Sequence, residues 1–107
     1  MGVKEIKSLA EFKQIINGPK PVVIDFSATW CGPCRIISPI FEKYTELSEF
    51  SASIGFYKVD VDDQPEISQE VGIRAMPTFM VFKNGEKADT LIGADPKKLH
   101  SLVSSLV

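Results

Sequence analysis

The stretch PVVIDFSATWCGPCRI, residues 21–36, decides the fold, because two kinds of secondary structure meet inside it. Residues 21–28 form an almost unbroken run of β-branched and aromatic side chains, typical of a strand buried on both faces in the middle of a sheet. A helical pattern begins at Pro33, which suits a first helical turn because its missing N–H leaves no hydrogen bond unmade. The sequence therefore predicts a central strand that leads directly into a helix.

The two cysteines of the chain, Cys31 and Cys34, both lie at this junction. A thiolate is stabilised there, because the first turn of a helix has unpaired N–H groups and a partial positive charge. We expect Cys31 at the exposed rim and Cys34 one turn inside, near enough to form a disulfide, since residues three apart on a helix are neighbours. Gly32 lets the turn tighten and leaves the first sulfur accessible. The pair is predicted to be redox-active.

The rest of the chain alternates between strand-like and helix-like segments at spacings typical of α/β proteins. The predicted segments are a helix at 8–17, a strand at 21–28, a helix from 33 to about 50, a strand at 54–61, a helix at 64–72, a hairpin at 77–93 that turns at Asn84-Gly85, and a helix from Asp95. The long helix is expected to turn inward Ile36, Ile37, Ile40, Phe41, Tyr44 and Leu47. The predicted fold class is α/β, one domain over residues 1–107, with a central five-stranded mixed sheet flanked by four helices in the order βαβαβαββα.

Composition excludes several classes of function. With 12 basic and 14 acidic residues the net charge is −2, so the chain lacks the basic stripe that binding to nucleic acid requires. No apolar run is long enough to span a membrane or to act as a secretory signal, so we expect a cytoplasmic protein, with a nuclear pool left open. In a reducing compartment two cysteines indicate catalysis or metal binding rather than a structural bridge.

Asp25 interrupts the buried strand at a position where an apolar side chain is expected. A structural interpretation is that its carboxylate is paired with nearby backbone or with Lys58, since an unpaired buried charge is costly. A functional interpretation is an acid with a raised pKa, close enough to Cys34 to exchange protons with it. The two interpretations are compatible.

Metal sites have little support in the sequence. A C-x-x-C pair is half of a zinc site, but only His100 could add a nitrogen ligand, and it is far from the pair along the chain. A c-type haem would need histidine where the chain has Arg35. The run DVDD at 60–63 resembles a calcium loop, but Pro65 and Val71 occupy the positions of its glycine and bidentate glutamate, so a strand end is the better interpretation.

Four stretches together carry a resemblance that covers nearly the whole chain: VVIDFSATWCGPCRIISPIFEK, VDVDDQPEISQEVGIRAMPTF, FKNGEK and IGADPKKL. They resemble the cytosolic thioredoxins of eukaryotes, of the fungal type. The resemblance implies the thioredoxin fold and a protein-disulfide reductase that works by dithiol–disulfide exchange in cell redox homeostasis. Two positions depart from common patterns: Ser27 replaces a frequent aromatic residue, and Ala75 stands where some animal relatives have a cysteine.

The resemblance also implies residue roles. Cys31 would attack the substrate disulfide, Cys34 would resolve the mixed disulfide, and Asp25 with Lys58 would tune proton transfer. Pro77 would be a cis-proline that exposes the backbone of Met76 to a substrate strand. The flat apolar docking surface would consist of Trp30, Gly32, Pro33, Ala75, Met76, Gly93 and Ala94. For Ala75 and Ala94, an ordinary surface or core position without a role in docking is an equally good interpretation.

Partners follow from the same resemblance. An NADPH-dependent thioredoxin reductase would re-reduce the pair, and targets would include peroxiredoxins, methionine sulfoxide reductases and ribonucleotide reductase. No bound cofactor is expected. We expect the protein to be mainly monomeric, and weak dimerisation through the surface around Trp30 is left open. Two alternatives remain. An oxidant or isomerase of the same fold would normally have a secretory signal and a polar residue in place of Pro33, and a binding module would not need its cysteines.

Overall fold

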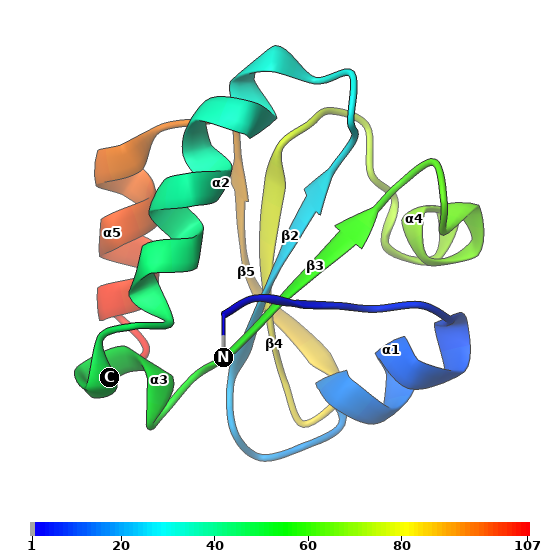
Figure 1. Cartoon of the computed structure of the whole chain (residues 1–107). Helices are drawn as coiled ribbons and strands as arrows, with labels where there is room; N and C mark the ends of the chain where they lie inside the picture. Colours follow the sequence, from blue (N-terminus) through cyan, green and yellow to red (C-terminus); the bar gives the residue numbers. More distant parts are fainter. Residues whose placement is uncertain (1) are drawn as a thin grey trace.

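The computed structural model describes residues 2–107, which form a mixed β-sheet between two layers of helices (Figure 1). Its strands are β1 (Lys4–Glu5), β2 (Val22–Ser27), β3 (Gly55–Asp60), β4 (Thr78–Lys83) and β5 (Glu86–Ile92). They lie in the order β1-β3-β2-β4-β5, with β1 and β2 parallel to β3, and with β4 antiparallel to both β2 and β5. The five-stranded mixed sheet confirms the predicted fold class.

Helices cover both faces of this sheet (Figure 1). They are α1 (Leu9–Ile16), α2 (Gly32–Tyr44), α3 (Ser48–Ser51), α4 (Pro65–Val71) and α5 (Pro96–Ser104). Side chains of α2, α3 and α5 form one buried cluster with the sheet, and side chains of α1 and α4 form a second cluster on the other face. Among residues 2–107 no helix is both long and apolar enough to cross a membrane.

Strand β2 lies at the centre of the sheet, where β3 and β4 pair with its two sides. Its side chains alternate between the two clusters: Val23 packs under α2, whereas Ile24 and Phe26 pack on the side of α1 and α4. Asp25, two residues after Val23, is therefore turned towards α2. The burial of both faces explains why this strand is so uniformly apolar.

Local sequence signals account for the turns and helix starts. The β4–β5 hairpin turns at Asn84 (φ 55°) and Gly85 (φ 83°), the left-handed pair that a tight two-residue turn needs, as predicted. The Asp95 carboxylate accepts the N–H groups of Lys97 and Lys98 and so caps α5. The hydroxyl of Ser8 accepts the Glu11 N–H at the start of α1 in the same way.

The helix predicted from 33 to about 50 is in fact two helices, which makes five rather than four in residues 2–107. Helix α2 ends at Tyr44, because the next three N–H groups bond to carbonyls three residues back and tighten the last turn. The prediction of inward side chains was wrong at Ile36 and Leu47, which are 71% and 44% exposed. Ile36 lies off the narrow buried stripe that Ile37 and Phe41 follow down the helix.

The core under α2 gives a stability prediction. Phe41 is buried, and the centre of its ring lies 5.5 Å from that of Phe56 and 5.2 Å from that of Phe79. Phe41→Ala should therefore lower the free energy of unfolding by about 3–5 kcal/mol, whereas Ile36→Ala on the same helix should change it by less than about 0.5 kcal/mol. Urea denaturation of the oxidised protein measures both. Equal losses would contradict the position of Ile36 outside the core.

Candidate active site

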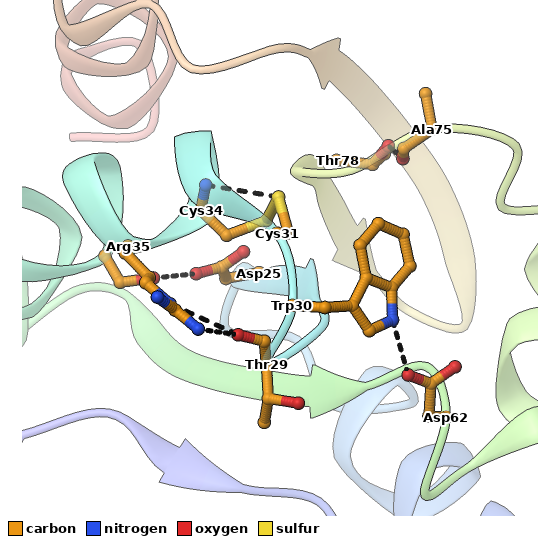
Figure 2. Close-up of a disulfide and its surroundings, with 10 residues drawn as sticks. Asp25, Thr29, Trp30, Cys31, Cys34, Arg35, Asp62, Ala75 and Thr78 are labelled. Carbon is orange, nitrogen blue, oxygen red and sulfur yellow. Dashed lines mark hydrogen bonds between the residues drawn. A yellow bond between two sulfur atoms is a disulfide. The ribbon is translucent and has the colours of Figure 1, made fainter.

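The two cysteines lie where β2 leads into α2, and a disulfide links them (Figure 2). Cys31 is the N-cap of α2, in an extended backbone conformation, and its Sγ accepts the N–H of Cys34 at 3.2 Å. The Cα atoms of the pair are 5.3 Å apart. Sulfur at this position thus meets the unpaired N–H groups of the helix start, which favour negative charge on it.

The burial of the pair differs from the prediction. Cys34 is 2% exposed, as expected for the inner residue, but Cys31 is only 5% exposed and does not form an open rim. The physical reason is the disulfide, which turns the Cys31 sulfur towards the helix and into a small cluster with Ala28, against which Met76 packs. Gly32 and Pro33, the next two residues, are exposed.

Asp25 lies on β2 on the same side of the sheet as α2, and its side chain is 2% exposed (Figure 2). Burial raises the pKa of this carboxyl from an ordinary 3.8 to about 7, an effect that the hydrogen bond from Ser38 and the charge of Lys58 partly offset. The Ser38 hydroxyl donates to Oδ2 at 3.3 Å, whereas the buried Oδ1 has no hydrogen-bond partner within residues 2–107.

Lys58 stands directly opposite Asp25 in the pairing of β2 with β3, which turns both side chains to one face. Its side chain is nevertheless exposed, and in the part of the chain that the structure describes no salt bridge joins the two. The structural interpretation of Asp25, a carboxylate held by backbone or by Lys58, therefore needs correction: the partner is the hydroxyl of Ser38, supplied by α2.

Trp30 extends from the junction into solvent, with 65% of its surface exposed (Figure 2). Its indole Nε1–H donates to Oδ2 of Asp62 at 2.8 Å, so the loop after β3 holds the ring in one orientation. On the other side, Arg35 donates from Nε and Nη2 to the carbonyl of Thr29, at 3.2 and 2.7 Å. These two contacts brace the loop that presents the cysteines.

Segments distant in sequence complete the surface around the disulfide. The Met76–Pro77 peptide bond is cis, as predicted, and the Thr78 hydroxyl donates to the Ala75 carbonyl at 2.6 Å, which stabilises this turn. The N–H of Gly93 donates to the Pro77 carbonyl at 2.9 Å, so the two loops lie together. Trp30, Gly32, Pro33 and Ala75 are exposed, and Met76, Gly93 and Ala94 are half-buried.

A comparison with known proteins places this geometry in a family. The sequence profile described as thioredoxin matches residues 3–105 of the chain. The chain belongs to the thioredoxin family. It is 58% identical over 102 residues to the thioredoxin of Malassezia sympodialis, with 95% of this chain and 96% of that protein covered. It is 56% identical to the thioredoxin of Coprinus comatus, with 94% of each covered.

Solved structures of the thioredoxin family have the same fold. The crystal structure of Malassezia sympodialis thioredoxin aligns with a TM-score of 0.95 at 56% identity, over 99% of this chain and 94% of that chain. A Plasmodium falciparum thioredoxin aligns with a TM-score of 0.88 at 43% identity, over 98% and 100% of the two chains. The protein is therefore a dithiol–disulfide oxidoreductase with protein-disulfide reductase activity, which acts on disulfide-containing target proteins.

The sequence did not predict four residues that the structure places at the site: Ser38, Arg35, Asp62 and Ile92. Ser38 could have been found, because it follows Cys34 by four residues and so shares its helix face. Ile92 could also have been found, because it directly precedes Gly93 of the predicted docking surface. In the structure its side chain is 66% exposed. The contacts of Asp62 with Trp30 and of Arg35 with Thr29 depend on loop geometry that has no local signature.

Metal binding finds no support in the described residues. Over residues 2–107 no group of three or more His, Cys, Asp or Glu side chains could hold a metal ion. The Asp60 carboxylate accepts the N–H groups of Asp62 and Asp63 and so closes the turn after β3. His100 lies on α5 with its ring near those of Tyr44 and Phe50.

The raised pKa of Asp25 predicts a pH-dependent stability. The folded oxidised protein keeps this proton up to about pH 7, whereas the unfolded chain releases it near the ordinary pKa of 3.8, so stability falls as pH rises between these values. Asp25→Asn should remove the decline and leave the variant more stable than the natural protein at pH 8, by up to about 4 kcal/mol. At pH 4 the two should be similar.

Urea denaturation at both pH values measures this difference. Asp89→Asn on β5 is a suitable control, because Asp89 is exposed and should show the pH dependence of the natural protein. If Asp25→Asn declined with pH as steeply as the natural protein, the carboxyl of Asp25 would not be the group responsible.

Proposed function

We propose that Cys31 is the nucleophile of this reductase and that Cys34 resolves the intermediate. In the reduced protein the Cys31 thiolate attacks one sulfur of a target disulfide, and the other target sulfur leaves as a thiolate. Cys34 then attacks the Cys31 sulfur, the bond to the target breaks, and the target's second thiolate departs. Two electrons pass to the target, and the Cys31–Cys34 disulfide is the oxidised product.

The hydrogen bond from the Cys34 N–H to the Cys31 sulfur is the observation that carries this assignment. It stabilises negative charge on Cys31, both when this sulfur attacks and when it leaves during the resolving step. Cys34 is the more deeply buried of the two, which suits a thiol that reacts only within the protein.

Asp25 is proposed to accept the proton of the Cys34 thiol during resolution, and to return it when the pair is re-reduced. A carboxyl with a pKa of about 7 divides nearly equally between acid and base at neutral pH, which is the best condition for moving a proton in both directions. The Lys58 ammonium on the neighbouring strand favours the ionised form and so adjusts this balance.

The docking surface is proposed to consist of the predicted residues together with Ile92: Trp30, Gly32, Pro33, Ala75, Met76, Ile92, Gly93 and Ala94. At the turn before Pro77, the backbone of Met76 would pair with an extended target segment, like a short added strand. Main-chain hydrogen bonds accept many target sequences, so this recognition is expected to be broad and weak.

The wider role is proposed from the family. An NADPH-dependent thioredoxin reductase would restore the dithiol, and targets would include peroxiredoxins, methionine sulfoxide reductases and ribonucleotide reductase. We propose a cytoplasmic location, where a reductant of this kind maintains thiols.

The order of the two cysteines predicts the outcome of a trapping experiment. Cys34→Ser should accumulate a mixed disulfide between Cys31 and a target, because nothing remains to resolve it. Cys31→Ser, the matched control, should form at least tenfold less. Non-reducing electrophoresis after incubation with insulin as the disulfide substrate measures both. Equal trapping by the two variants, or more by Cys31→Ser, would reverse the assignment.

The midpoint potential of the Cys31–Cys34 couple tests the direction of electron flow. Equilibration against dithiothreitol, monitored by Trp30 fluorescence, should give a midpoint potential of about −270 mV, the value for thioredoxin. A value of about −180 to −120 mV would instead indicate an oxidant or isomerase. A couple that could not be reversed would favour a binding module in which the cysteines are incidental.

A further inference from the structure

Ser38 lies one helical turn after Cys34 on α2, and so on the same face of the helix. This face is turned to the sheet, where the Ser38 hydroxyl donates to Oδ2 of Asp25 at 3.3 Å. The side chain of Ser38 is half-buried, and Asp25 is almost fully buried. The hydroxyl is thus placed on the same buried carboxyl that the reaction is proposed to use.

The two oxygens of the Asp25 carboxyl have different surroundings. Oδ2 accepts the Ser38 hydroxyl, whereas Oδ1 is buried without a partner within residues 2–107. A buried oxygen without a hydrogen bond is costly when it is ionised and is therefore a favourable site for a proton. The asymmetry leaves one oxygen for a structural contact and one for proton exchange.

We infer that Ser38 is a positioning residue for proton transfer: its hydroxyl holds Oδ2 of Asp25 and leaves Oδ1 to exchange the proton of Cys34. The inference rests on the proposed role of Asp25. In the resolving step Cys34 forms its bond to the Cys31 sulfur, the target sulfur leaves with the electron pair of the broken bond, and the Cys34 proton passes to Oδ1. The Ser38 hydrogen bond stabilises the carboxylate that must be present before this transfer.

Charged groups around the site come from three elements. Lys58 on β3 stands opposite Asp25 and favours its ionised form. Cys34 and Ser38 share with Lys58 the wall of a cavity of about 550 Å³, whose other charged lining residues are Glu5 on β1, Asp60 on β3 and Arg35 on α2. On the other side of β2, the residue paired with Asp25 is the uncharged Phe79 of β4. Ser38 is the one group that donates a hydrogen bond to the carboxyl among the described residues.

The experiment follows the two chemical steps separately with dithiobis(nitrobenzoate), an aromatic disulfide that releases the coloured thiolate thionitrobenzoate. In stopped flow with the reduced protein, the first thiolate reports attack by Cys31 and the second reports resolution by Cys34. Ser38→Ala should shift the pH profile of the second release upward by about 0.5 to 1 pH unit, because the carboxylate loses its donor. Near pH 7 this corresponds to a resolving step about twofold to fivefold slower, a deficit that disappears near pH 9.

Two variants separate this role from a merely structural one. Ser38→Thr keeps a hydroxyl and should restore the natural pH profile. Ser68→Ala on α4 removes another half-buried helical serine, remote from the disulfide, and should leave both releases unchanged. A Ser38→Ala deficit of equal size at all pH values and in both releases would mean that Ser38 only supports packing, and would overturn the inference.

Asp25→Asn distinguishes failure of this inference from failure of the proposed function. If Asp25→Asn abolishes the pH inflection of the second release but Ser38→Ala leaves it in place, Asp25 moves the proton without help from Ser38 and the inference alone is wrong. If Asp25→Asn keeps the natural inflection, Asp25 is not the proton acceptor, and both proposals fail.

Discussion

The amide of Cys34 points at the sulfur of Cys31, and the rest of the site is arranged around this contact. It exists because the chain leaves the centre of the sheet on β2 and begins a helix at once, with Cys31 as the N-cap. The first N–H groups of a helix have no partner in the helix itself, so they favour charge on an adjacent sulfur. The sheet keeps this helix start in place because β2 is hydrogen-bonded on both sides.

The same central strand carries a carboxyl into the protein interior. Asp25 is tolerated there because α2 supplies a hydroxyl and β3 places a lysine on the same face. Burial costs the ionised form so much that the pKa rises to about 7. A residue that is unfavourable for stability at neutral pH is thus suited to the proton transfer proposed for it, a reason to keep it in the core.

The surface around the disulfide is assembled from four segments. The loop before α2 presents Trp30, the turn after β3 orients it through Asp62, and the cis turn at Pro77 lies against Gly93 at the end of β5. All four lie near the ends of strands in one sheet, so the strand order brings them to one surface. The cysteine pair depends on one strand–helix junction, whereas the surface around it depends on the whole fold.

The sequence by itself determined the fold class, the reactive cysteines and the hairpin turn, because each depends on local patterns: a buried β-branched run, a pair three residues apart, and Asn84-Gly85. It overestimated the long helix and the burial of Ile36, since periodicity cannot show where a helix ends or which edge of an apolar stripe meets the sheet. Only the tertiary structure decided that Asp25 bonds to Ser38, 13 residues away, and Trp30 to Asp62, 32 residues away. Those contacts depend on how separate elements pack against one another, and no local sequence pattern specifies which distant residues will meet.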